Sequence, residues 1–171
     1  MVEFTRTSAS GRSHPLPGGL NLTREFDRMV LARTRGSAPD EALEILAAKA
    51  GEGRFEVGGR LLTARWSLEA LPASACLGRE EETFALARFA LPLRFRSWRP
   101  GDRIRLSYGS KKLKKLLGEA RVPVSERGQM PVLVDGLDRV LWVPGIARGT
   151  GTEPVPGEDV IHVGVSDDGG A

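Results

Sequence analysis

Residues 93–121 read LRFRSWRPGDRIRLSYGSKKLKKLLGEAR, and this stretch determines how charge is distributed along the chain. It contains ten Lys or Arg residues and two acidic residues, a net charge of +8, whereas the rest of the 171 residues carry −5. The overall charge of +3 therefore conceals a local concentration of positive charge. A concentrated positive field is what binding of a polyanion requires.

Two short segments of this stretch, 93–96 and 103–106, alternate apolar and basic residues. On strands, a period of two places Phe95, Ile104 and Leu106 on one face of a sheet and the arginines on the other. The Arg-Pro-Gly-Asp segment between them predicts a turn. The stretch therefore begins as two strands whose arginines share a face.

After Ser110 the spacing of the apolar residues changes from that of a strand to that of a helix. Leu113, Leu116, Leu117 and Ala120 have the i, i+3, i+4, i+7 spacing of one helical face. Ser110 is suited to the N-cap, and the Val-Pro pair that follows Arg121 ends the helix, because a residue before proline avoids the α region. We therefore predict a short basic helix.

Four lysines lie at the start of this predicted helix. Lys111 and Lys115 point directly away from the apolar face, and Lys112 and Lys114 flank it. Lysines at a helix start oppose the helix dipole, at roughly 0.3–1 kcal/mol each. A docked phosphate would reverse that cost, because N–H and ammonium groups would share one anion. The pattern favours a phosphate-binding surface over the alternative, a helix whose lysines only confer solubility.

The rest of the sequence predicts an α+β fold. Short strands are expected at 20–22 and 26–33, and a hairpin is expected over 55–66 around Gly58-Gly59. Residues 40–50 favour a helix by propensity, with a strand through Leu43–Ile45 as the alternative. Residues 71–82 predict a loop, and 84–89 a short strand or a turn of helix.

The second half predicts a compact sheet. Strands at 131–134 and 140–143 flank Asp-Gly-Leu-Asp, a strong hairpin signal, and 160–165 form a last strand. We therefore predict four regions: a flexible tail (1–19), a β-rich unit (20–91), a compact domain whose sheet is covered by the short basic helix (92–165), and a frayed end (166–171).

Composition and motifs exclude several classes of function. Cys76 is the single cysteine and His14 and His162 lie far apart, so neither a disulfide nor a metal site is expected. The N-terminus has no apolar segment of a signal peptide, and no apolar run approaches the ~20 residues of a membrane helix, which indicates a cytoplasmic protein. No P-loop, GxGxxG or GxSxG motif is present, so no catalytic residue is predicted. Asp102 and Glu126, each beside an arginine, are expected to form structural ion pairs.

Five blocks of the sequence, in order, resemble the C-terminal domain of bacterial tRNA(Ile)-lysidine synthetases. They read RSWRPGDRI (96–104), KKLKKLL (111–117), VPVSER (122–127), MPVLVDG (130–136) and LWVPGI (141–146). Residues 20–33 are similar, more weakly, to the strand pair that precedes this domain in the same enzymes. The resemblance covers about residues 92–147.

The resemblance implies a role in tRNA modification. The family is a ligase that couples lysine to C2 of the wobble cytidine with ATP, and its C-terminal domain helps to hold the tRNA, largely near the acceptor stem. That domain shares a fold with a domain of the phenylalanyl-tRNA synthetase β subunit. The family's ATP-pyrophosphatase domain and its SGGxDS phosphate loop are missing from this sequence. The chain is therefore expected to need no cofactor and to be inactive alone, as a truncated or separately encoded part or as a reused RNA-binding module.

Charge and resemblance together predict a tRNA-binding C-terminal part of such an enzyme, with tRNA(Ile) as the expected partner. Trp98 and Tyr108 are candidates for stacking on an exposed base, with packing at the core or its rim as the alternative, and Trp142 is predicted to lie in the core. The expected phosphate contacts, which position a nucleic acid rather than read its bases, are Arg96, Arg99, Arg103, Lys111, Lys112, Lys114, Lys115 and Arg121.

Two other functions compete with tRNA binding. One is an interaction domain that docks on a separate ATP-pyrophosphatase subunit and never meets RNA, for which an apolar surface patch is expected. The other is a helix attracted to anionic membrane. Its narrow apolar face and its length of about three turns disfavour that reading.

Overall fold

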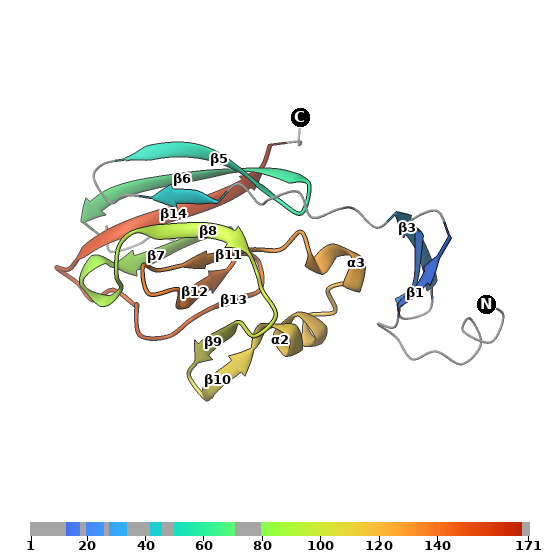
Figure 1. The fold of residues 1–171 in the computed structure, drawn as a ribbon. Helices are drawn as coiled ribbons and strands as arrows, with labels where there is room; N and C mark the ends of the chain where they lie inside the picture. Colours follow the sequence, from blue (N-terminus) through green and yellow to red (C-terminus); the bar gives the residue numbers. More distant parts are fainter. Residues whose placement is uncertain are drawn as a thin grey trace.

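The computed structural model describes residues 13–17, 20–25, 28–33, 42–45, 50–70 and 80–168, and most of their regular structure is β (Figure 1). The strands form three sheets with three, four and seven members. In Figure 1 the three-stranded sheet lies apart from the other two, on the side of the short helix α3 (Val124–Arg127). The other two sheets are stacked and contain the main core.

The three-stranded sheet is antiparallel, in the order β1 (Ser13–Leu16), β2 (Leu20–Glu25) and β3 (Arg28–Arg33). Its β2–β3 pair confirms the strands predicted over 20–33, although residues 26 and 27 lie outside the described part. Strand β1 corrects the predicted flexible tail, because its residues pair with β2 from Ser13 to Leu16.

The four-stranded sheet has the order β5 (Gly51–Val57), β6 (Arg60–Ala70), β14 (Asp159–Asp167) and β7 (Glu81–Ala85), and all neighbours are antiparallel. The predicted hairpin around Gly58-Gly59 is confirmed. Gly58 has φ +57°, and a Cβ there would lie 2.3 Å from the carbonyl oxygen of Gly128, so the turn requires glycine. A 3₁₀ turn, η1 (Leu86–Arg88), follows β7.

The seven-stranded sheet has the order β10, β9, β12, β11, β8 and β4, with β13 also paired to β12. Its strands are β4 (Leu43–Ile45), β8 (Leu93–Ser97), β9 (Arg103–Leu106), β10 (Gly109–Lys112), β11 (Pro131–Val134), β12 (Val140–Val143) and β13 (Ala147–Arg148). The helix predicted over 40–50 is wrong at Leu43–Ile45, where the alternative strand is observed; residues 46–49 lie outside the described part. Burial of Ile45 against β8 outweighs the helix propensity of this segment.

Aromatic side chains join the two stacked sheets. Phe55 stacks on Phe95 with ring centroids 4.9 Å apart, and Trp142 lies 6.3 Å from Phe95 and 6.4 Å from Phe84. Trp142 is buried, as predicted. Aromatic pairs in these geometries add to the stability that their burial provides.

The opposite face of the seven-stranded sheet is covered by α2 (Leu113–Glu119), whose Leu113 and Leu117 pack with Ile104, Val132 and Val143. The prediction that Phe95 shares a face with Ile104 and Leu106 is wrong. Phe95 lies in the core between the two stacked sheets. β8 and β9 are not neighbours, because β11 and β12 lie between them in the sheet. The face of the sheet that the apolar residues of β9 occupy therefore does not determine the face occupied by those of β8.

The helix also starts later than predicted. Ser110 to Lys112 belong to β10, and Lys112 occupies the N-cap without a side-chain hydrogen bond. The Ser110 hydroxyl instead accepts a hydrogen bond from Nε of Arg103 at 2.9 Å. Leu116 is half-buried and Ala120 is exposed, so only two of the four predicted positions are fully buried.

Hydrogen bonding crosses the predicted division at residue 92 in two places. β4 from the first half pairs with β8, and β14 from the second half lies between β6 and β7. The domain boundaries therefore stay a prediction, while the sheets interlock the two halves.

A buried ion-pair network fixes the turn between β8 and β9. The side chain of Arg96 is 6% exposed, and its guanidinium donates to both carboxylate oxygens of Asp102, at 2.8 and 3.1 Å, and to Asp138 at 3.3 Å. Asp102 also accepts the N–H of Arg99 at 2.6 Å, and its carbonyl accepts the N–H of Leu113 at 2.9 Å. The predicted ion pair of Asp102 is confirmed, whereas Glu126 forms none with the described residues.

The packing of α2 predicts unequal effects of two neighbouring substitutions. Leu117→Ala should lower the free energy of unfolding by about 2–5 kcal/mol, because it removes a buried side chain and leaves a cavity. Leu116→Ala should cost less, and Lys115→Ala should stay within about ±0.5 kcal/mol. Urea denaturation of the three variants measures this, and equal losses for the two leucines would contradict the packing of α2.

The network predicts a second stability effect. Arg96→Met should cost about 3–5 kcal/mol, because it leaves the poorly exposed carboxylate of Asp102 without its partner. Arg105→Met, at an exposed position, is the matched control and should change stability by less than about 0.5 kcal/mol. Urea denaturation decides this as well: an Arg96→Met variant as stable as its control would show that the pair contributes nothing.

Candidate nucleic-acid interface

The β9–β10 hairpin presents its arginines and one lysine to solvent. The register pairs Arg103 with Lys112, Arg105 with Ser110, and Ile104 with Lys111. Directly opposed residues of an antiparallel pair share a face. Arg103, Arg105 and Lys112 therefore share the exposed face, whereas Lys111 lies with the buried Ile104 on the face toward the core.

Further exposed cations lie next to this hairpin in the sequence. Lys115 lies on the side of α2 turned away from the buried Leu113 and Leu117, and Lys114 flanks that apolar side; both lysines are exposed. Figure 1 shows the hairpin and α2 together at one end of the molecule, away from the four-stranded sheet. We call the exposed cations of residues 99–121 the basic surface; its members are Arg99, Arg103, Arg105, Lys112, Lys114, Lys115 and Arg121.

The basic surface carries charge that the described part of the chain leaves uncompensated. None of its seven members forms a salt bridge with a described residue, although the guanidinium of Arg103 bonds the hydroxyl and carbonyl of Ser110. Arg121 has φ +57°, an uncommon conformation for a residue with a side chain. Exposed cations that form no salt bridge are available to an anionic ligand.

Two predicted phosphate contacts have internal partners instead. Arg96 is buried within the network described above. The Lys111 side chain is 17% exposed, and its ammonium group bonds the Glu119 carboxylate. This hydrogen bond raises the pKa of Lys111 and lowers the pKa of Glu119.

The structure separates the two candidate stacking residues. Trp98 packs against the cluster beneath α2, and its indole N–H donates to the carbonyl of Arg127 at 2.6 Å. Tyr108 lies in the turn of the β9–β10 hairpin and is 72% exposed. Trp98 is therefore a packing residue, whereas the ring of Tyr108 is open to solvent beside the basic surface.

Arg105 is the one member of the basic surface that was not among the predicted contacts. The sequence could have identified Arg105, because side chains two residues apart on a strand lie on the same face. The alternation that places Arg103 on the outer face therefore places Arg105 there as well. Its carbonyl accepts the N–H of Thr150 at 2.8 Å, which ties this edge of the hairpin to the loop after β13.

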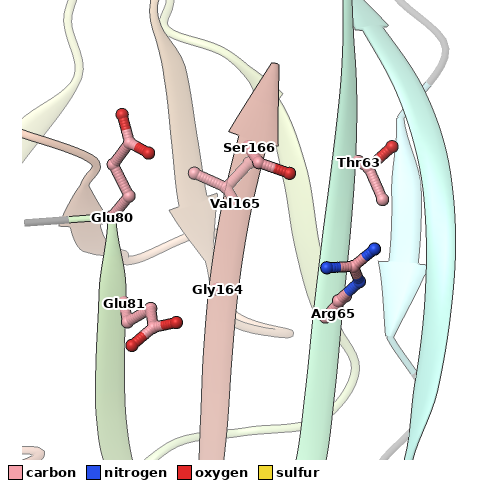
Figure 2. A pocket seen from close by; sticks show the side chains of 7 residues that line it. All are labelled: Thr63, Arg65, Glu80, Glu81, Gly164, Val165 and Ser166. Atoms are coloured by element: carbon pink, nitrogen blue, oxygen red, sulfur yellow. The ribbon is translucent and has the colours of Figure 1, made fainter. Parts of the chain in front are cut away.

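An open groove of about 470 Å³ lies elsewhere, over the four-stranded sheet (Figure 2). Figure 2 shows Glu80 and Glu81 on one side and Thr63 and Arg65 on the other, with β14 between them. Arg65 is engaged by Glu52. The mixture of charges gives this groove no preference for a polyanion.

Two other classes of site are absent from the described residues. No group of three His, Cys, Asp or Glu residues lies close enough there to hold a metal ion. None of the described helices is long and apolar enough to span a membrane. Cys76 lies outside the described part.

Comparison with known proteins identifies the region that carries the basic surface. Residues 91–163 match the model of the TilS substrate C-terminal domain. A tRNA(Ile)-lysidine synthase from Symbiobacterium thermophilum is 35% identical over 149 residues, which are 83% of this chain and 30% of that protein. The corresponding synthase from Geobacter sulfurreducens is 32% identical over 156 residues, 90% of this chain and 32% of that protein.

A solved structure, described as the crystal structure of the TilS C-terminal domain, has a similar fold. It superposes with a TM-score of 0.61 at 23% identity, covering 76% of this chain and all of that one. The chain spans about a third of the length of the curated relatives that it matches. Taken together, the matched domain and these relatives show that the chain carries the TilS C-terminal domain of tRNA(Ile)-lysidine synthases over residues 91–163.

Proposed function

We propose that this chain is the tRNA-binding part of a tRNA(Ile)-lysidine synthase, which holds tRNA(Ile) while lysidine is formed from ATP and lysine at the wobble cytidine. The observation that carries the proposal is the basic surface: seven exposed cations without salt bridges to described residues, all within the matched domain. The adenylation chemistry is assigned to an ATP-pyrophosphatase domain, whose SGGxDS loop this sequence does not contain. A cytoplasmic location, where tRNA is modified, follows from the same proposal.

The basic surface is built on rigid elements, which favours binding. Ile104 anchors the hairpin in the core, and the N–H of Leu113 ties the start of α2 to the turn at Asp102. Same-face residues on a strand, such as Arg103 and Arg105, are about 7 Å apart, so each can contact a different phosphate. Cations held in position before binding lose less freedom when the ligand arrives.

The competing function, docking on a separate catalytic subunit, has less support. The large apolar side chains that are exposed in the described part come from separate segments of the chain, whereas the exposed cations there that form no salt bridge come from one segment, residues 99–121. These apolar residues, apart from Tyr108, are Leu31, Leu61, Leu91, Leu137 and Val155. A single basic surface favours a polyanion over an apolar interface.

The first functional prediction concerns salt. Binding of tRNA to the chain should weaken steeply as salt rises, with the logarithm of the affinity falling by roughly 0.7–0.9 per phosphate contact for each decade of salt. Fluorescence anisotropy with labelled tRNA at several salt concentrations measures the slope. A flat dependence, or no binding at low salt, would overturn the proposed function.

Matched variants localise the contacts. Lys114→Ala with Lys115→Ala should weaken tRNA binding and lower the salt slope by about two contacts, with stability changed by at most about 0.5 kcal/mol per site. Arg54→Ala with Arg65→Ala removes the same charge from exposed positions on β5 and β6 and should leave the slope unchanged. Equal slopes for the two double variants would show that the lysines of α2 only confer solubility.

The second functional prediction concerns catalysis. The chain incubated with ATP, lysine and tRNA(Ile) should form no lysidine, because none of its motifs cradles a triphosphate. Nucleoside analysis by mass spectrometry tests this, with the complete synthase from Geobacillus kaustophilus as the positive control. Lysidine formed by this chain without added protein would show that it carries an active site of its own.

A further inference from the structure

The tip of the β9–β10 hairpin carries an aromatic side chain that the fold does not use. Leu106 pairs with Gly109, so Ser107 and Tyr108 form a two-residue turn. Gly109 follows with φ +122°, a conformation that only glycine adopts readily. Tyr108, at 72%, is the most exposed of the large apolar side chains in the described part of the chain, so its burial contributes little to stability.

Two side chains nevertheless hold the ring of Tyr108 in place. The ammonium group of Lys111 lies 3.4 Å from the Tyr108 hydroxyl and 5.5 Å from the ring centroid, so it meets the hydroxyl end of the ring. Lys111 is held in turn by Glu119 at the end of α2. These contacts orient the ring at its polar end, and the exposed ring face stays open to a planar ligand.

The surroundings indicate which planar ligand fits. On the exposed face of the same hairpin, Arg105 lies nearest the turn, and Arg103 and Lys112 lie at the other end of the two strands. An RNA strand that follows these cations would pass the tip that carries Tyr108. Aromatic side chains beside cations that hold phosphates are the usual platform for unpaired bases. Bases inside a duplex are covered by their neighbours, so only a nucleotide in a loop, a bulge or a single-stranded end offers a free face.

Resting on the proposed function, we propose that Tyr108 stacks on an unpaired base of the bound RNA, and that Lys111 positions this ring instead of contacting a phosphate. The ligand class is then an RNA duplex that carries an unpaired nucleotide beside the paired region. The basic surface holds the phosphates, and Tyr108 adds a requirement for a base. An anchor for a protein partner, the other common role of an exposed tyrosine, is an outcome of the test below.

Two RNAs with identical phosphates separate these possibilities. Both are hairpins with a four-nucleotide 3′ overhang, and in one of them the overhang is abasic. Tyr108→Ala should weaken binding of the base-bearing RNA by about 5- to 150-fold, the usual effect of losing one stacked base. It should leave binding of the abasic RNA and both salt slopes unchanged. Tyr108→Phe keeps the ring but loses the hydroxyl that Lys111 contacts, so it should weaken binding of the base-bearing RNA less than Tyr108→Ala does.

Tyr108 is also the single tyrosine of the chain, which permits a direct observation. Protein grown with 3-fluorotyrosine should give one ¹⁹F resonance. The base-bearing RNA should shift this resonance by the ring current of the stacked base, whereas the abasic RNA should leave it nearly unmoved. A resonance that moves equally with both RNAs, or with neither, would overturn the stacking assignment.

Lys111→Met tests the positioning role. It should weaken binding of the base-bearing RNA and reduce its ¹⁹F shift while leaving the salt slope unchanged. A slope lower by one contact, roughly 0.7–0.9, would make Lys111 a phosphate contact and overturn its positioning role.

The outcomes distinguish this inference from the function on which it rests. If the parent binds neither RNA at low salt, the proposed function fails and the inference fails with it. If the parent binds both RNAs and Tyr108→Ala binds both as tightly as the parent, only the stacking inference fails, and a protein anchor becomes the better reading of Tyr108. Equal weakening on both RNAs would likewise exclude base stacking.

Discussion

The bidentate ion pair between Arg96 and Asp102 sets the geometry on which the candidate interface depends. Through one aspartate it joins β8, the turn at residues 99–102 and the first residue of α2. Breaking such a poorly exposed pair is costly because it leaves one charge without a partner, so these elements hold their relative positions as a unit. The cations of the hairpin and of α2 are thereby fixed relative to the sheet, although Arg96 itself is withdrawn from solvent.

The sequence predicts the strands well where their signals are local. Apolar runs at 131–134 and 140–143 become β11 and β12, and the glycines at 58 and 59 turn the β5–β6 hairpin. The failures have non-local causes: the helix-favouring segment at Leu43–Ile45 is a strand because it pairs with β8, about 50 residues away. Ser110 is likewise taken from its expected N-cap by pairing with Arg105 across the hairpin.

The candidate site, like the strands, could be predicted from the sequence only where its features depend on residues that are close together in the chain. Charge density locates the basic surface, and the strand period identifies its exposed members, because both are properties of one continuous stretch. The partners of individual charges are a property of the fold. Arg96 is engaged by Asp138, 42 residues away, and Lys111 by Glu119 at the far end of α2. A sequence pattern gives the sign of a charge but not whether an opposite charge already neutralises it.

Some cations of this stretch are paired with acidic residues of the fold and others form no salt bridge. Under the proposed function, this difference affects which RNAs the surface would select. Phosphate contacts position an RNA without reading its bases, so a surface made only of free cations would hold many RNAs almost equally well. Pairing Lys111 with Glu119 removes one charge from that unselective attraction and sets the ammonium group beside Tyr108 instead. The same lysine that the sequence assigns to affinity then contributes to selectivity, because an oriented aromatic ring favours RNAs that present an unpaired base.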